Sequence, residues 1–287
     1  MTATFLSLLA ETFRRCNSDR VPRMGAALSF YTVLSMAPLS ILLLTLVGLV
    51  VERSAAREEM VAQVRSFVGV DGANVLEMIL TSTSMDSESS LWLTLLGFAV
   101  LLVGASGMFV EIQDSLNQIW QVSSKRHPVF VLLRERALSI VMILVLGVVM
   151  VLSFLFSAVT GAAVSYLGGK YPILGGSWDW GVSILSLVAI AMLFALIFRL
   201  VPDARVAWKD VWLGAGLTAL LFAAGKGLLG FYFGRSAIAS SYGAAGSLII
   251  ILVWVFYSAQ IILFGAELTH VYAMRHGSHR EKSQAVV

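Results

Sequence analysis

The sequence predicts an all-α integral membrane protein, and three observations support this. Of 287 residues, 58% are hydrophobic and 13% are charged, about half the charged fraction of roughly 25% that is typical of a soluble domain. The mean hydropathy is +0.86. Several stretches of about 20 residues carry no ionisable side chain, which is the length needed to cross a hydrocarbon core of about 30 Å. A soluble enzyme, a disordered chain and a fibrous protein are excluded.

Uninterrupted apolar runs predict six transmembrane helices. We expect them near residues 26–51, 91–111, 137–167, 180–200, 211–234 and 243–269. Pro38 falls within the first span and is expected to kink it, because proline removes one backbone hydrogen bond and clashes with the preceding turn. The runs GAALSF at 25–30 and GAGLTALLFAAG at 214–225 are alike. Small residues match by chance in such a composition, so we infer no repeat and treat residues 1–287 as one transmembrane domain.

The segments between the spans predict additional helices at the membrane surface. Residues 52–90 are acidic, and apolar residues recur there at helical spacing on both sides of Asp71 and Gly72. We therefore expect an external amphipathic segment of two helices that are separated at that point. A further in-plane helix is expected around Phe5 to Phe13, and another at 128–137. Residues 270–287, with His270, His276 and His279, are expected to form a solvated cytoplasmic tail.

The distribution of lysine and arginine predicts the orientation of the chain. The N-terminal arm and every second connection after it hold 14 basic residues, and the segments on the opposite side hold five. Lys226 is the remaining basic residue and lies within a span. Basic residues are retained on the cytoplasmic side, so both termini are predicted to be cytoplasmic.

Lys226 is an ionisable residue within a predicted span, which makes it a candidate functional residue. It lies about 22 Å along the fifth span from Val211, at about 1.5 Å per residue, in the outer third of the membrane. Three interpretations remain open: the side chain extends to the outer interface, it packs against a partner, or it contacts a substrate. Gly225 and Gly227 favour close helix contact around it.

A second polar group gathers near the predicted cytoplasmic ends of three spans. These residues would form either an interhelical network lining a polar vestibule or ordinary interfacial caps, since charges at span ends cost little. At the expected depths, Glu267 and Lys226 do not pair. With Lys226 and Tyr232, the candidate substrate-binding residues are Glu111, Asp114, Asn117, Arg199 and Glu267.

Motifs for catalysis and cofactor binding are absent from the sequence. It has no GxSxG, HExxH, P-loop or Rossmann pattern. The single cysteine, Cys16, allows neither an internal disulfide nor a zinc site made of two CxxC pairs. A net charge of +3 is too small for nucleic-acid binding without a local basic cluster. We therefore expect a protein that is not an enzyme, with no cofactor, no metal and no nucleic-acid partner.

Four blocks of the sequence resemble the bacterial YihY/BrkB family of membrane proteins. The blocks are MGAALSFYTVLSMAPL at 24–39, SLNQIWQV at 115–122, VPDARVAWKDVWLGAGLTALLFAAGKGLLGFYF at 201–233 and YGAAGSLIIILVWVFYSAQIILFGAELTHVY at 242–272. The resemblance implies six spans in the bacterial inner membrane with both termini cytoplasmic, in agreement with the charge count. The family often has asparagine where this chain has Thr269. An old ribonuclease label for some members is at odds with the lack of a metal-ligand cluster here.

Two functions follow as hypotheses. The first is a transporter or flippase for a lipid or another anionic amphiphile, acting in envelope homeostasis. It is supported by the few charges in mid-membrane, the amphipathic surface helices and the position of Lys226. The alternative is a non-transporting scaffold for envelope assembly. The expected partners are membrane lipids, with envelope proteins or a second copy of the chain as further partners.

Overall fold

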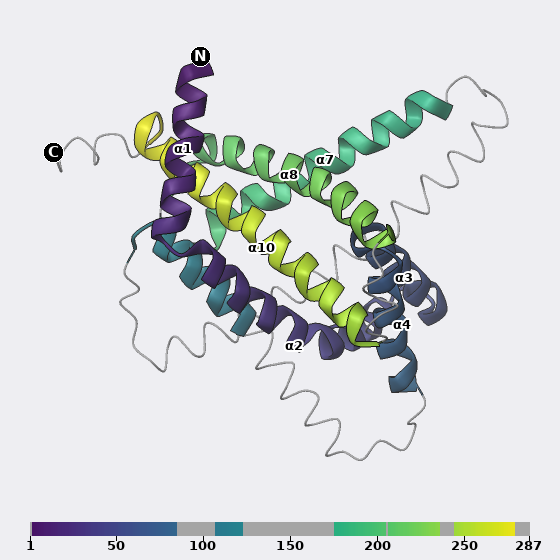
Figure 1. Cartoon of the computed structure of the whole chain (residues 1–287). Helices are drawn as coiled ribbons and strands as arrows, with labels where there is room; N and C mark the ends of the chain where they lie inside the picture. Colours follow the sequence, from purple (N-terminus) through teal and green to yellow (C-terminus); the bar gives the residue numbers. More distant parts are fainter. Residues whose placement is uncertain (1, 85–106, 123–174, 205, 236–243, 279–287) are drawn as a thin grey trace.

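A computed structural model provides the structure of the chain and describes residues 2–84, 107–122, 175–204, 206–235 and 244–278 (Figure 1). Within these ranges every regular element is a helix and there is no strand, so the all-α prediction is confirmed there. The predicted third span, the predicted helix at 128–137 and most of the second span lie outside the described residues.

Three of the described helices are long and apolar enough to cross a membrane. They are α2 (Val21–Val47), α8 (Trp208–Arg235) and α10 (Ala244–Arg275). Helix α10 packs against both α2 and α8, and α7 (Gly175–Leu200) packs against α8 (Figure 1). These helices are those of a membrane protein, as the composition predicts.

Other helices cover the two ends of this bundle. Helix α1 (Thr2–Ser18) packs near the end where α10 finishes, and α3 (Arg53–Val68) and α4 (Val70–Ser84) pack together at the opposite end (Figure 1). The two helices expected within 52–90 are therefore present. They separate at Gly69, which has φ +94°, and not at Asp71 and Gly72 as predicted. Glycine adopts this positive φ without a steric penalty.

Several helix ends differ from the predicted spans. Helix α2 begins and ends several residues earlier than expected and continues through Pro38. Residues 107–119 are helical, so helix is present beyond residue 111, where the second predicted span was expected to end. Helix α10 extends to Arg275, so His270 is a buried residue of this helix and not part of a solvated tail. The physical reason is packing, because its neighbours Val271 and Ala273 are also buried.

A reciprocal contact between glycine and threonine joins α8 to α10. The Thr218 hydroxyl donates to the Gly214 carbonyl at 2.7 Å, and the Thr269 hydroxyl donates to the Gly265 carbonyl at 2.8 Å. A Cβ atom on Gly214 would overlap Thr269 Oγ1, and one on Gly265 would overlap Thr218 Oγ1. Each threonine thus occupies the space that the glycine of the other helix leaves open, which lets the backbones approach closely.

The pattern Gly-Ala-x-Leu-Ser/Thr occurs once on each of α2, α8 and α10. It is GAALS at 25–29, GAGLT at 214–218 and GAELT at 265–269. In the first copy the Ser29 hydroxyl donates to the Gly25 carbonyl at 2.7 Å, and a Cβ atom on Gly25 would overlap the Gln260 side chain. The likeness that the sequence showed between 25–30 and 214–225 therefore has a local structural meaning, because each copy marks a place where α10 meets a neighbour.

Substituting Gly265 with alanine is expected to destabilise the bundle, whereas the same change at Gly216 is not. A Cβ atom at Gly216 meets nothing within 4 Å. Overpacking at Gly265 should lower the free energy of unfolding by about 1–3 kcal/mol, and Gly216→Ala should leave it equal or raise it because alanine favours helix. Thermal unfolding in detergent measures both variants.

Removing the obstructing hydroxyl should restore stability. The double variant Gly265→Ala/Thr218→Ala is expected to unfold at a higher temperature than Gly265→Ala alone. Equal unfolding temperatures for the two single glycine variants would contradict the reciprocal contact.

Candidate functional site

Glu267 is a fully buried carboxyl group on α10. Its side chain is 0% exposed, and neither oxygen accepts a hydrogen bond from an amide or hydroxyl donor of the described residues. A buried charged group without such partners destabilises a fold by several kcal/mol. Helix packing therefore does not explain why a carboxyl group stands at this position, and this makes it the centre of the candidate site.

The surroundings of Glu267 come from α10, α1 and the turn between α1 and α2. His270 lies one turn further along α10, and its ring is 5.0 Å from the Trp120 ring. On the other side, the charges of Asp19 and Arg15 act on Glu267. Two carboxyl groups are thus brought together by segments that are far apart in the sequence.

Cys16 lies beside the same two carboxyl groups. Burial raises the pKa of its thiol to about 12, and the negative charges of Glu267 and Asp19 act in the same direction. The thiol is therefore protonated at neutral pH and is a poor nucleophile. Cys16 serves here as a small, partly buried residue of α1.

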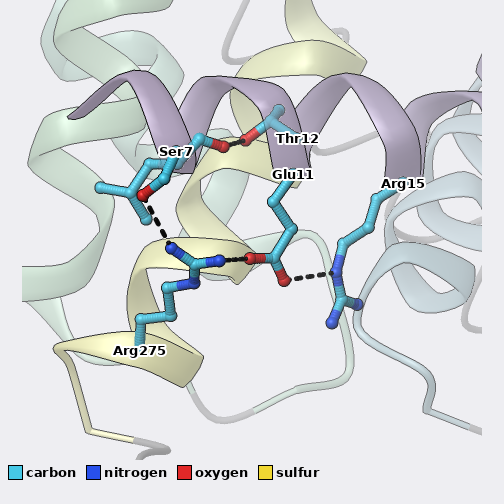
Figure 2. A network of polar contacts seen from close by, with 6 residues as sticks. Ser7, Glu11, Thr12, Arg15 and Arg275 are labelled. Carbon is cyan, nitrogen blue, oxygen red and sulfur yellow. Dashed lines mark hydrogen bonds and ion pairs between the residues drawn. The ribbon is translucent and has the colours of Figure 1, made fainter. Parts of the chain in front are cut away.

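A network of ion pairs holds α1 against the end of α10 (Figure 2). Arg275 pairs with Glu11 and donates to the Ser7 hydroxyl at 3.1 Å. Glu11 also pairs with Arg15 at 3.5 Å, one turn further along α1. The positive charge of Arg15 therefore acts on both Glu11 and Glu267.

Asn117 fastens the 107–119 helix to the turn that follows α7. Its side-chain oxygen accepts from the Asp203 backbone N–H at 2.8 Å, and its Nδ2 donates to Asp203 Oδ2 at 2.9 Å. Gln113 donates to Asp203 Oδ1 at 3.4 Å. Asp203 was not among the residues predicted from the sequence, because its contact with Asn117 joins positions that are 86 residues apart.

The other predicted inner residues have surroundings that differ from those of Glu267. The Arg199 guanidinium stacks on the Trp208 ring at 4.2 Å, and its Nη1 is buried without a hydrogen bond among the described residues. Asp114 is exposed, and Glu111 is half-buried with Asp114 and Arg23 as its charged neighbours. Of the five predicted inner residues, the structure buries Asn117 and Glu267.

Lys226 lies on α8 in the half of the bundle that includes α3 and α4, and its side chain is exposed. Gly225 faces α10, where its missing side chain makes room for the Tyr257 ring, while a Cβ atom on Gly227 would meet nothing within 4 Å. The side chain of Tyr232 lies outside the described residues.

Lys226 and Glu267 belong to two separate places in the bundle. Gly214 opposes Thr269 and Gly225 opposes Tyr257, so α8 and α10 are antiparallel. This register separates Lys226 from Glu267 by about ten residues, or about 15 Å along the bundle. Within the described residues, no group of three or more His, Cys, Asp or Glu side chains could hold a metal ion.

The chain belongs to the family described as Virulence factor BrkB, whose family model matches residues 12–286. It is similar to a UPF0761 membrane protein of Chromohalobacter salexigens, with 30% identity over 92% of this chain and 62% of the relative. The corresponding protein of Ralstonia nicotianae is 27% identical over 91% of this chain and 58% of its own length. A UPF0761 membrane protein of Pseudomonas aeruginosa is 30% identical over 92% of this chain and 61% of its own length.

The chain therefore spans about three-fifths of the length of these curated relatives. No solved structure matches the chain. The names of these relatives describe membrane proteins, in agreement with the apolar helices of this chain.

Removing the Asn117 side chain is expected to destabilise the protein. Asn117→Ala removes the acceptor of the Asp203 N–H and one donor to the Asp203 carboxylate, and the loss of these two hydrogen bonds should lower the free energy of unfolding by about 1–3 kcal/mol. Gln118→Ala is the matched control, because Gln118 is exposed and makes one hydrogen bond at the surface. Unfolding of both variants in detergent checks the difference, and an equal effect would argue against the Asn117 bridge.

Proposed function

We propose that the chain is a transporter or flippase that moves a lipid or another anionic amphiphile and contributes to envelope homeostasis. The observation that carries this proposal is the exposed position of Lys226 on an apolar helix. At this end of α8, Gly225 faces α10, whereas Lys226, Gly227 and Leu228 are exposed. An exposed cation within a membrane helix attracts the anionic headgroup of an amphiphile, and the adjacent glycine leaves space for it.

The apolar surface of α7 supports the same proposal. Large apolar side chains project from one stretch of this helix and are 36–68% exposed; they are Ile184, Leu185, Val188, Met192, Leu193, Leu196 and Leu200. Contiguous exposed apolar surface is typical of contact with membrane or with another protein. Acyl chains of a bound amphiphile would lie against such a surface while the headgroup meets Lys226.

The alternative function is a non-transporting scaffold for envelope assembly, and the α7 surface is the observation that favours it. A partner helix would cover the same exposed side chains, for example Leu193 and Leu200. In this case Lys226 would be dispensable, because packing along α7 does not involve it.

The proposal includes the bacterial inner membrane as the location and the cytoplasm as the side of both termini. The excess of basic residues in alternate connections supports this orientation. A second support is that α1 and the end of α10 lie together at one end of the bundle, joined by Glu11 and Arg275 (Figure 2). Because α1 and the last turns of α10 lie at the same end of the bundle, the chain between them would cross the membrane an even number of times.

Lipid translocation in proteoliposomes tests the function. Wild type and Lys209→Ala are expected to move a fluorescent anionic lipid, and Lys226→Ala should be slower by about tenfold, or about 1.4 kcal/mol in barrier height. Lys209 is the matched control, because it is an exposed lysine in the first turn of the same helix. A fluorescent zwitterionic lipid should respond less to the loss of Lys226.

The result that overturns transport is a folded, inserted wild type that moves neither lipid faster than empty liposomes do. Crosslinking from position 193 on α7 would then identify a scaffold partner. Equal rates for Lys226→Ala and wild type would leave a transporter whose pathway does not use Lys226.

Labelling of introduced cysteines tests the orientation. In a Cys16→Ser background, Ser54→Cys on α3 should react with a membrane-impermeant thiol reagent in intact spheroplasts. Arg14→Cys and His276→Cys should react only after the spheroplasts have been permeabilised. All three positions are exposed, so accessibility reports the side of the membrane. Reaction of the Arg14 variant in intact spheroplasts would contradict a cytoplasmic N-terminus.

A further inference from the structure

Glu267 lies on a face of α10 that the contact with α8 does not use. Gly265 and Thr269 make that contact, whereas the charges that act on Glu267 are those of Asp19 and Arg15. The glutamate is 0% exposed, and both of its oxygens are buried without a hydrogen bond from the described donors. The contacts between the helices therefore do not explain why residue 267 is a glutamate.

The charged and titratable groups around Glu267 come from each neighbouring element. On α10 itself there is His270. Helix α1 contributes Arg15 and Cys16, the turn before α2 contributes Asp19, and Arg23 on α2 acts on Glu111. From α7, Arg199 is stacked on Trp208, and α8 faces α10 at this depth with the uncharged Gly214 and Thr218.

The positions of Asp19 and Glu267 favour a shared proton. Two neighbouring carboxyl groups repel each other when both carry a charge, and burial away from water disfavours the charged form as well. Asp19 is half-buried in a turn at the end of the bundle, whereas Glu267 has no access to water. Burial therefore favours the protonated form at Glu267, and Asp19 lies nearer to the solvent.

We propose that Glu267 is a proton-binding site, loaded from the α1 end of the bundle through Asp19. A proton passes from water to the Asp19 carboxylate and from there to the Glu267 carboxylate, and no other bond changes. The reverse transfer leaves Glu267 negatively charged, and Arg15 is the cation next to it.

Loss of the proton would also act on the contact between α1 and α10. Arg15 pairs with Glu11, and Glu11 pairs with Arg275 at the end of α10 (Figure 2). A charged Glu267 competes with Glu11 for Arg15, so deprotonation rearranges the ion pairs that hold α1. Protonation and a movement of α1 are thereby coupled. The proton site does not depend on the proposed substrate.

Infrared difference spectroscopy of the full-length protein in nanodiscs tests this inference. The C=O stretch of a protonated carboxyl group should be present at neutral pH and disappear as the pH is raised. Glu267→Gln should remove this titrating band. Glu58→Gln, which changes an exposed glutamate of α3, should leave it unchanged.

Two further variants keep the test decisive if Glu267→Gln does not fold. Asp19→Asn removes a neighbouring negative charge, so the band should be lost at a pH lower by about one unit or more. Arg15→Gln removes a neighbouring positive charge, so the loss should shift to higher pH. A band that survives Glu267→Gln, or that shifts in neither of these variants, overturns the proposal. No substrate is added, so failure here and failure of lipid transport are separate results.

Discussion

The close approach of α8 and α10 at paired glycines is the contact on which the other described features depend. Gly214 and Gly265 lack side chains, and Thr269 and Thr218 fill the space between the two helices. The threonine hydroxyls bond to carbonyls of their own helices, so no polar group of this contact is left without a partner in the apolar interior. The register set here fixes the depth of each polar residue on both helices.

That register produces two polar places with different chemistry. On α8, Lys226 is exposed near α3 and α4. On α10, Glu267 follows Gly265 by two residues and is therefore turned into the region below α1. The exposed cation and the enclosed carboxyl group lie about 15 Å apart, and they carry the two separate proposals of headgroup contact and proton binding.

Local sequence patterns predicted most of the described helices and misplaced some of their ends. The 3.6-residue periodicity indicated α3 and α4 correctly, but the break lies at Gly69 because the positive φ there suits a glycine. The end of α10 was placed six residues too early, since apolar runs mark the membrane core and do not report how far a helix continues into protein contacts. For the site, Asn117 and Glu267 were among the candidates, whereas Asp203 and Asp19 were not.

The sequence by itself determined the class of protein, because apolar composition and the length of uninterrupted runs are properties that a membrane selects directly. It also determined the family, through blocks that extend along nearly the whole chain. Only the tertiary structure decided that Glu267 is buried beside Asp19 and that Asn117 is engaged by Asp203. These pairs join residues separated by 86 positions or more along the chain. Their contacts arise from helix register and crossing, which a one-dimensional pattern of polarity does not contain.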